Sequence, residues 1–167
     1  MAISDYLKGL RARIGTTLVL MPAANALIRD DDGRVLLGRA ASAGVWVLPG
    51  GAIDPDEPPQ DAVVREVWEE VGLTVEPIRC LGTFGGPEFQ VTYANGDRVS
   101  YVSTIYACRV VEGTLRPDGE EILEARWVAT SELPTIGLAR ALRTFLPELL
   151  RRTDGWVPPV GWRPPVG

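Results

Sequence analysis

The sequence contains no histidine. Histidine is the side chain that most often acts as a general base near neutral pH, and imidazole is a common metal ligand. Its absence excludes a Ser-His-Asp triad and any metal site built on imidazole. Acid–base and metal chemistry in this chain must therefore depend on carboxylates and other oxygen groups, which favour hard ions such as Mg²⁺ or Mn²⁺.

Cysteine and lysine are scarce as well. Two cysteines, Cys80 and Cys108, are too few for a disulfide framework or a zinc site, and each lies in an apolar, strand-like run. We therefore expect two buried free thiols. Of the 17 basic residues only Lys8 is a lysine, and the net charge of −5 disfavours a nucleic-acid partner, which would need a basic stripe.

Long apolar runs are also missing. The longest, Leu18 to Ile28, is interrupted by Pro22 and Asn25 and is too short to cross a bilayer. Residues 1–9 contain no apolar core of a secretory signal. We therefore predict a cytoplasmic protein with no membrane partner. The length of 167 residues suits one domain with a substantial core.

The most informative segment is residues 51–73, GAIDPDEPPQDAVVREVWEEVGL. If this segment is helical, Glu66, Glu69 and Glu70 fall within about 100° of arc. Apolar residues occupy a different arc and are expected to face a sheet: Val63, Val64, Val67, Trp68 and Val71. Clustered carboxylates repel one another unless a cation neutralises them. The segment therefore indicates a divalent-metal site on one face of a helix.

The same segment resembles the Nudix box, G-x5-E-x7-R-E-U-x-E-E-x-G-U, in which U is aliphatic, and every defined position matches. The resemblance extends to WVLPGG before the box and to RWV and ELP after it, so that about residues 20 to 150 follow the family pattern. It implies an α/β fold with a mixed (α+β) sheet, the Nudix-type α/β/α sandwich in which the box forms a loop–helix–loop.

The resemblance also implies which residues carry the chemistry. The residues expected to hold Mg²⁺, with Mn²⁺ as an alternative, are Gly50 through its carbonyl oxygen, Glu66, Glu69 and Glu70. Family members often add one more acidic ligand or base from a loop before the late strand. Glu120, Glu121 and Glu124 lie there, and we favour Glu121 as a further catalytic residue. Whether Glu66 or a loop glutamate is the general base stays open.

Four box residues are expected to support the site rather than to react: Gly51, Glu57, Arg65 and Gly72. Glu57 and Arg65 match a pair that forms a salt bridge between the loop and the helix. The two glycines suit backbone conformations that are unfavourable for a residue with a Cβ. Asp56 departs from the pattern, because family members usually carry glycine at that place.

The activity implied is attack of water on a phosphorus atom of a diphosphate-containing small molecule, since metal ions on clustered carboxylates provide the positioning and charge neutralisation that phosphoryl transfer needs. A nucleoside diphosphate derivative, ADP-ribose or a nucleotide sugar, is the preferred substrate. A house-cleaning pyrophosphohydrolase of oxidised nucleoside triphosphates and a non-catalytic nucleotide-sensing module are the alternatives. Downstream candidates for substrate contacts are Phe84, Phe89, Tyr93 and Tyr101.

The chain is expected to form one Nudix domain at residues 1–152, followed by a tail at 153–167. Helices are predicted at 4–13, from about 58 to 71, and at 138–152, where Pro147 should kink or restart the helix. Strands are predicted at 16–29, 34–39, 45–48, 74–84, 89–93, 99–111 and 125–128. The tail carries Trp156 and Trp162 in two similar Pro-rich copies. It is either an extended segment or an anchor on the domain or on the partner in a homodimer.

Overall fold

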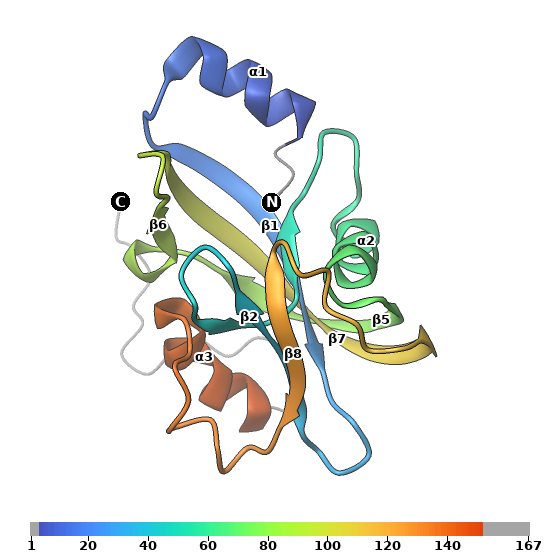
Figure 1. The fold of residues 1–167 in the computed structure, drawn as a ribbon. Helices are drawn as coiled ribbons and strands as arrows, with labels where there is room; N and C mark the ends of the chain where they lie inside the picture. Colours follow the sequence, from blue (N-terminus) through green and yellow to red (C-terminus); the bar gives the residue numbers. More distant parts are fainter. Residues whose placement is uncertain (1–3, 152–167) are drawn as a thin grey trace, which may run out of the picture.

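The computed structural model describes residues 4–151, and the predicted tail lies outside the described residues. Within that range the helices are α1 (Asp5–Ile14), α2 (Pro59–Val71) and α3 (Arg140–Arg151), with a short 3-10 helix, η1 (Pro87–Phe89). The strands are β1 (Val19–Ile28), β2 (Val35–Ala40), β3 (Trp46–Val47), β4 (Gly50–Ala52), β5 (Leu73–Phe84), β6 (Gln90–Thr92), β7 (Arg98–Gly113) and β8 (Ile122–Val128). Figure 1 shows their arrangement. No helix in the described range is long and apolar enough to cross a membrane.

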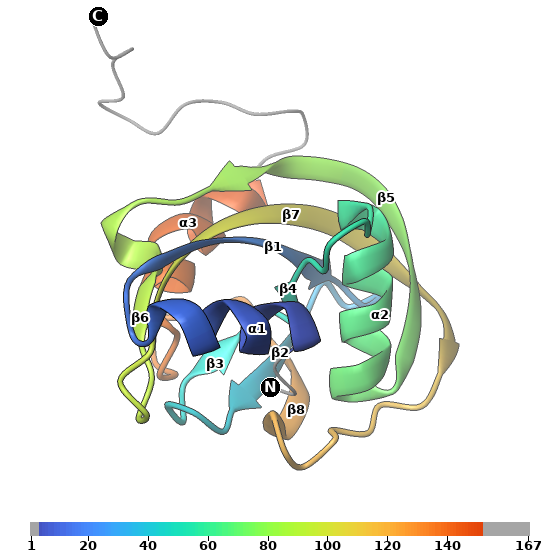
Figure 2. The ribbon, with the colours of Figure 1, turned by 90° about the horizontal axis from the view of Figure 1, so that it is seen from above.

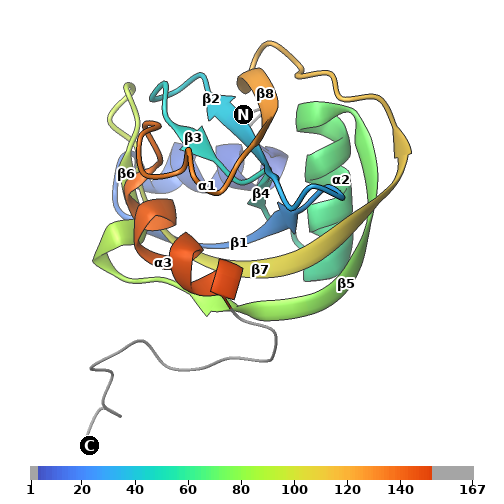
Figure 3. The ribbon, with the colours of Figure 1, turned by 90° about the horizontal axis from the view of Figure 1, so that it is seen from below.

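The strands form two sheets. The larger has the order β4-β1-β7-β5, with β6 also paired to β7. In it β1 and β7 run parallel, whereas the other pairs are antiparallel. The smaller sheet, β3-β2-β8, is antiparallel. Views from above and below show β1, β7 and β5 as a curved layer that runs past α2 and α3 (Figure 2, Figure 3). The predicted mixed α+β fold is confirmed.

Helices α2 and α3 pack on opposite faces of the strands, because successive strand residues point in opposite directions. Ala26 and Ile28 of β1 belong to the core under α2, whereas Leu27 between them belongs to the core under α3. The α3 core is filled from the helix by Leu142, Leu146 and Leu149. Fully burying such a side chain contributes about 1.5–3 kcal/mol. This packing fixes both helices and leaves the acidic stripe of α2 toward the end of β4.

Residues of α2 are buried as adjacent pairs along one stripe, namely Ala62–Val63, Glu66–Val67 and Glu70–Val71. Trp68 lies one step of about 100° beyond this stripe. Its side chain is 62% exposed. The prediction that Trp68 faces the sheet was therefore wrong, because the stripe that the sheet covers is narrower than the run of apolar residues.

The signals at the helix ends were read correctly. The Ser4 hydroxyl accepts a hydrogen bond from the backbone N–H of Leu7 (3.3 Å) at the start of α1. Gly72 ends α2 in the left-handed conformation, with φ 71°. Helix α3 continues through Pro147, so that of the two predicted outcomes, a kink or a restart, the restart does not occur. A proline removes one N–H donor, and the buried leucines on both sides of it hold the two halves in one helix.

Two features of the strands were not foreseen. Strand β4 forms in a glycine-rich segment because it pairs with β1, with Gly50 opposite Asn25 and Ala52 opposite Ala23. Cys80 is exposed rather than buried, since β5 is the outer strand of the larger sheet and Cys80 points away from the core. Cys108 is buried as predicted, and both thiols are free.

Candidate active site

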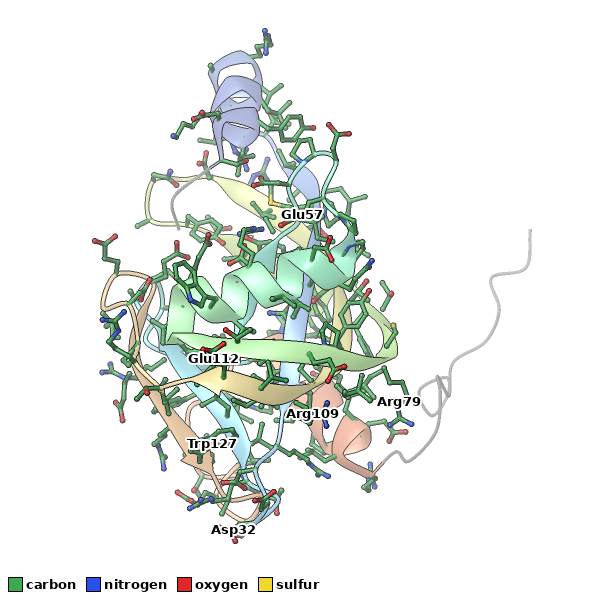
Figure 4. The ribbon with its side chains drawn as sticks, turned by 90° about the vertical axis from the view of Figure 1, so that its right-hand side faces the viewer. Asp32, Glu57, Arg79, Arg109, Glu112 and Trp127 are labelled. Carbon is green, nitrogen blue, oxygen red and sulfur yellow. The ribbon has the colours of Figure 1, made fainter. Side chains whose placement is uncertain are left out.

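Arg65 ties the loop before α2 to the helix. Its guanidinium donates two hydrogen bonds of 2.8 Å to the Glu57 carboxylate, forming the expected salt bridge. It also donates to Glu66 Oε1 (2.9 Å), to Glu69 Oε2 (3.2 Å) and to the carbonyl oxygen of Ala52 (3.1 Å). The bond from Arg65 lowers the pKa of Glu57. Figure 4 shows Glu57 in the loop that lies between α2 and α1.

Asp56 is the residue of this loop that stands where family members usually carry glycine. Its φ of 67° lies in the left-handed region, and it is the only non-glycine residue with positive φ in the described part of the chain. A residue with a Cβ is strained there, by about 1–2 kcal/mol, although aspartate tolerates the conformation better than most. The left-handed backbone thus gives a physical reason for the family's glycine at position 56. Asp56 adopts the same backbone conformation and is strained by it.

The carboxylates of α2 meet the two glycines of β4. Glu70 Oε2 accepts a hydrogen bond from the backbone N–H of Gly50 (2.8 Å). A Cβ added to Gly51 would stand 2.6 Å from Glu66 Oε2. Close approach of the Glu66 carboxylate, rather than a left-handed backbone, therefore favours glycine at position 51.

Glu66 and Glu70 are buried carboxylates, with 9% and 7% of their surface exposed. Burial raises the pKa of Glu66 to about 7, although Arg65 opposes this shift. Burial also raises the pKa of Glu70 well above its ordinary value, and the N–H of Gly50 opposes it. Repulsion from Glu121 adds to the rise in both pKa values. The three carboxylates therefore lie close enough to affect one another's charge.

Glu121 directly precedes β8, in a turn that Asp118 holds in place. The Asp118 carboxylate accepts hydrogen bonds from the backbone N–H groups of residues 120–122, at 2.9–3.2 Å. Glu124, another candidate from this region, lies within β8 and pairs with Arg39 (3.3 Å). Of the two, Glu121 is the one placed beside the carboxylates of α2.

Glu69 lies at the exposed edge of this group, and its negative charge also raises the pKa of Glu66. Its side chain is half exposed and bonds to Arg65 on the outer side of α2. Among residues 4–151 no three His, Cys, Asp or Glu side chains converge on a point that could hold a metal ion. Glu66 and Glu70 each have an oxygen engaged by a hydrogen-bond donor. As a set of donors, however, anionic oxygens without nitrogen or sulfur fit a hard divalent cation.

A cavity of about 750 Å³ opens beside Glu70 and Glu121, between β1, β7, the loop after β2, η1 and α3. Three of the predicted contact residues line it, namely Phe89, Tyr93 and Tyr101. Phe84 does not. Its ring stacks on Phe145 with centroids 4.9 Å apart, and Phe145 in turn stacks on Phe89 at 5.6 Å. Phe145, on which Phe84 stacks, lines the cavity in its place.

Two hydrogen-bonded pairs provide polar groups in the cavity wall. The hydroxyl of Ser103 donates to Asn25 Oδ1 (2.5 Å), and the hydroxyls of Tyr93 and Tyr101 bond to each other (2.6 Å). Burial raises the pKa of Tyr101, which therefore stays protonated. For the pair of Asn25 and Ser103, the sequence offered one sign of a polar site, because Asn25 interrupts an apolar strand. Ser103 gave no signal, because β7 brings it there from 78 residues away.

Comparison with known proteins decides the family. The model of the NUDIX domain matches residues 19–151. The chain belongs to the Nudix family. A MutT-like protein of Streptomyces ambofaciens is 33% identical over 137 residues, which cover 82% of this chain and 79% of the relative. Nudix hydrolases act on small nucleotide substrates, and the chain is an enzyme of this family.

Two further similarities concern Nudix proteins with named activities. A putative 8-oxo-dGTP diphosphatase of Bacillus subtilis (strain 168) is 27% identical over 111 residues, covering 66% of this chain and 68% of the relative. The solved structure of an ADP-ribose pyrophosphatase from Streptococcus suis aligns with a TM-score of 0.62 and 27% identity, covering 81% of this chain and 96% of that one. These Nudix relatives indicate pyrophosphohydrolase activity and leave the substrate unspecified.

Proposed function

We propose that this Nudix hydrolase cleaves the diphosphate linkage of a nucleoside diphosphate derivative by attack of water on phosphorus. One observation carries the proposal: Glu70 and Glu121 line a cavity of about 750 Å³ together with Gly50 and Gly51 of β4, and the Glu66 carboxylate lies against Gly51. A cavity of that volume is in the range that takes a nucleotide-sized ligand, about 300–1,000 Å³.

Glu66, Glu69, Glu70 and the carbonyl oxygen of Gly50 are the groups that would hold Mg²⁺, or Mn²⁺ in its place. A divalent cation bound there supplies neutralisation of the diphosphate charge. Glu121 lines the cavity and is the first candidate to accept the proton of the attacking water. Glu66, whose carboxylate is buried against Gly51, is the alternative.

ADP-ribose or a nucleotide sugar is the preferred substrate, and the similarity to the Streptococcus suis ADP-ribose pyrophosphatase supports it. The second candidate is an oxidised nucleoside triphosphate, hydrolysed to monophosphate and pyrophosphate. The Bacillus subtilis relative, a putative 8-oxo-dGTP diphosphatase, favours that substrate. Both reactions would use the same carboxylates. They differ in the substrate group that the cavity must bind, a sugar in the first case and an oxidised base in the second.

A substrate panel tests the proposal. Purified protein with Mg²⁺ is incubated with ADP-ribose, nucleotide sugars and ordinary or oxidised triphosphates, and the released monophosphate, phosphate and pyrophosphate are measured. We expect the nucleoside diphosphate derivatives to be cleaved with the highest kcat/KM. Glu70→Gln should remain folded and lose most of its turnover, whereas Glu124→Gln, a control in β8, should keep it. Near-normal activity of Glu70→Gln would show that the assignment is wrong.

A further inference from the structure

A second cavity, of about 320 Å³, lies under α1. Leu7 and Leu10 of α1 form one wall, residues 19–22 of β1 a second, and residues 52–55 of the box loop a third, with Arg65 and Glu66 completing the lining. Figure 2 shows α1 lying between β6 and α2. Because α1 precedes the residues that the family model matches, an element outside the Nudix pattern builds one wall of this cavity.

Helix α1 is held firmly in this position. Leu7 is buried in a cluster with Met21 and Val99. The guanidinium of Arg11 donates hydrogen bonds to the carbonyl oxygens of Thr17 (2.7 Å) and Arg98 (2.9 Å). These contacts join the helix to the start of β1 and of β7. The cavity wall is therefore a fixed part of the fold.

The two cavities adjoin at the buried carboxylates of α2, Glu66 and Glu70. Gly51 lines the larger cavity and Glu66 lines the smaller one. A Cβ on Gly51 would lie only 2.6 Å from Glu66 Oε2, so these two groups are in contact. Tyr101 also lines the larger cavity while packing against the cluster that contains Leu7 of α1. The carboxylates thus have a cavity on each side.

The smaller cavity is poorly suited to a chain of phosphates. Among the described residues that line it, Arg65 is the only cation. Its hydrogen bonds already go to the carboxylates of Glu57, Glu66 and Glu69 and to a backbone carbonyl. The other walls are largely apolar side chains of α1 and β1. An uncharged organic group fits these walls better than a phosphate tail, which would lie against the Glu66 carboxylate.

We propose that the smaller cavity binds the second organic group of a substrate whose diphosphate joins two organic groups, while the nucleoside occupies the larger cavity. This inference rests on the proposed hydrolysis and adds a binding site for the half of the substrate that a nucleoside triphosphate lacks. Leu10 and the other α1 residues in the wall are then specificity-determining residues, although they lie outside the Nudix box.

The test fills the smaller cavity and compares two adenosine substrates. Leu10→Trp places a large ring in the cavity, whereas Leu18→Trp is the control, because Leu18 is 43% exposed and lines neither cavity. For Leu10→Trp we expect kcat/KM for ADP-ribose to fall about tenfold or more, mainly through KM, while kcat/KM for ATP changes less than about threefold. Leu18→Trp should change neither value. Leu10→Ala provides a second variant if Leu10→Trp fails to fold, and should alter KM for ADP-ribose alone.

Equal losses for ADP-ribose and ATP, or no loss for either, would overturn the assignment of the smaller cavity. If the wild-type protein cleaves none of the nucleotides tested, the proposed function fails instead. Calorimetric titration of wild-type protein and Leu10→Trp with ADP-ribose in the presence of Mg²⁺ then decides the cavity question separately. Binding that is about tenfold weaker in the variant supports the assignment, and equal or undetectable binding by both proteins overturns it.

Discussion

Replacing Glu66 with glutamine should stabilise the metal-free protein at alkaline pH while removing its activity. Burial holds the pKa of this carboxyl group at about 7, compared with an ordinary value of 4.5. The fold therefore favours the neutral form. Stability is fully present below about pH 4.5, falls as the pH rises through 7, and stays lower above it. Glutamine is uncharged at every pH and escapes this loss.

The size of this stability change follows from the shift in the pKa of Glu66. A change in pKa from 4.5 to about 7 corresponds to about 3 kcal/mol of folding free energy, at about 1.4 kcal/mol for each pH unit. Glutamine does not reproduce every contact of the carboxyl group with Arg65. We therefore expect Glu66→Gln to be about 1–3 kcal/mol more stable than the wild type at pH 8, and to differ by less than about 1 kcal/mol at pH 4.5.

Urea unfolding in EDTA at the two pH values measures this difference. Glu69→Gln is the matched control on the same helix, because its side chain is half exposed. It should change stability by less than about 1 kcal/mol at both pH values. The reasoning is refuted if Glu66→Gln is no more stable than the wild type at pH 8, or if the difference is the same at both pH values.

Three further predictions concern the loop and the thiols. Asp56→Gly should raise the free energy of unfolding by about 1 kcal/mol by relieving the left-handed backbone, and unchanged or lower stability in thermal melts would contradict this. Arg65 lowers the pKa of Glu57, so the stability that this pair contributes is present above the ordinary pKa and lost as the pH falls through the lowered one. Glu57→Gln should cost about 1–3 kcal/mol at pH 7 and less at pH 3, measured by chemical unfolding. A thiol reagent should label exposed Cys80 rapidly in the native protein, and buried Cys108, whose pKa is raised to about 12, only after unfolding.

The box and the helix ends could be predicted because their signals are local. Ser4 and Gly72 act on residues within one turn, and the contact between Glu57 and Arg65 was implied by the resemblance of the segment to the Nudix box. The predictions of burial were wrong where the sequence pattern shows that a residue lies among apolar residues but does not show which neighbour covers it. Trp68 and Cys80 lie in apolar runs, yet both side chains are exposed in the described part of the chain.

The cavities could not be predicted, because they depend on pairing between distant segments. The parallel pairing of β1 with β7 places Asn25 beside Ser103, and no local pattern records it. The stacking of Phe145 of α3 on Phe89 of η1 likewise joins residues far apart in the chain. A resemblance confined to the family pattern also says nothing about α1, which closes the smaller cavity.

In a chain without histidine, the carboxylates that we propose for the reaction also affect the stability of the fold. Within residues 4–151, Arg65 donates hydrogen bonds to the carboxylates of Glu57, Glu66 and Glu69 but not to that of Glu70. Glu66 and Glu70 are therefore buried without full neutralisation, and each has a raised pKa. Substituting either by a neutral side chain should favour the metal-free fold and impair hydrolysis, as expected where function requires a locally unfavourable arrangement. Substituting Glu57 should instead lower the stability of the fold, since its carboxylate accepts two hydrogen bonds from Arg65 and keeps the loop in place. The sign of the stability change thus separates the carboxylates that we propose to act in hydrolysis from the one that we propose to support the loop.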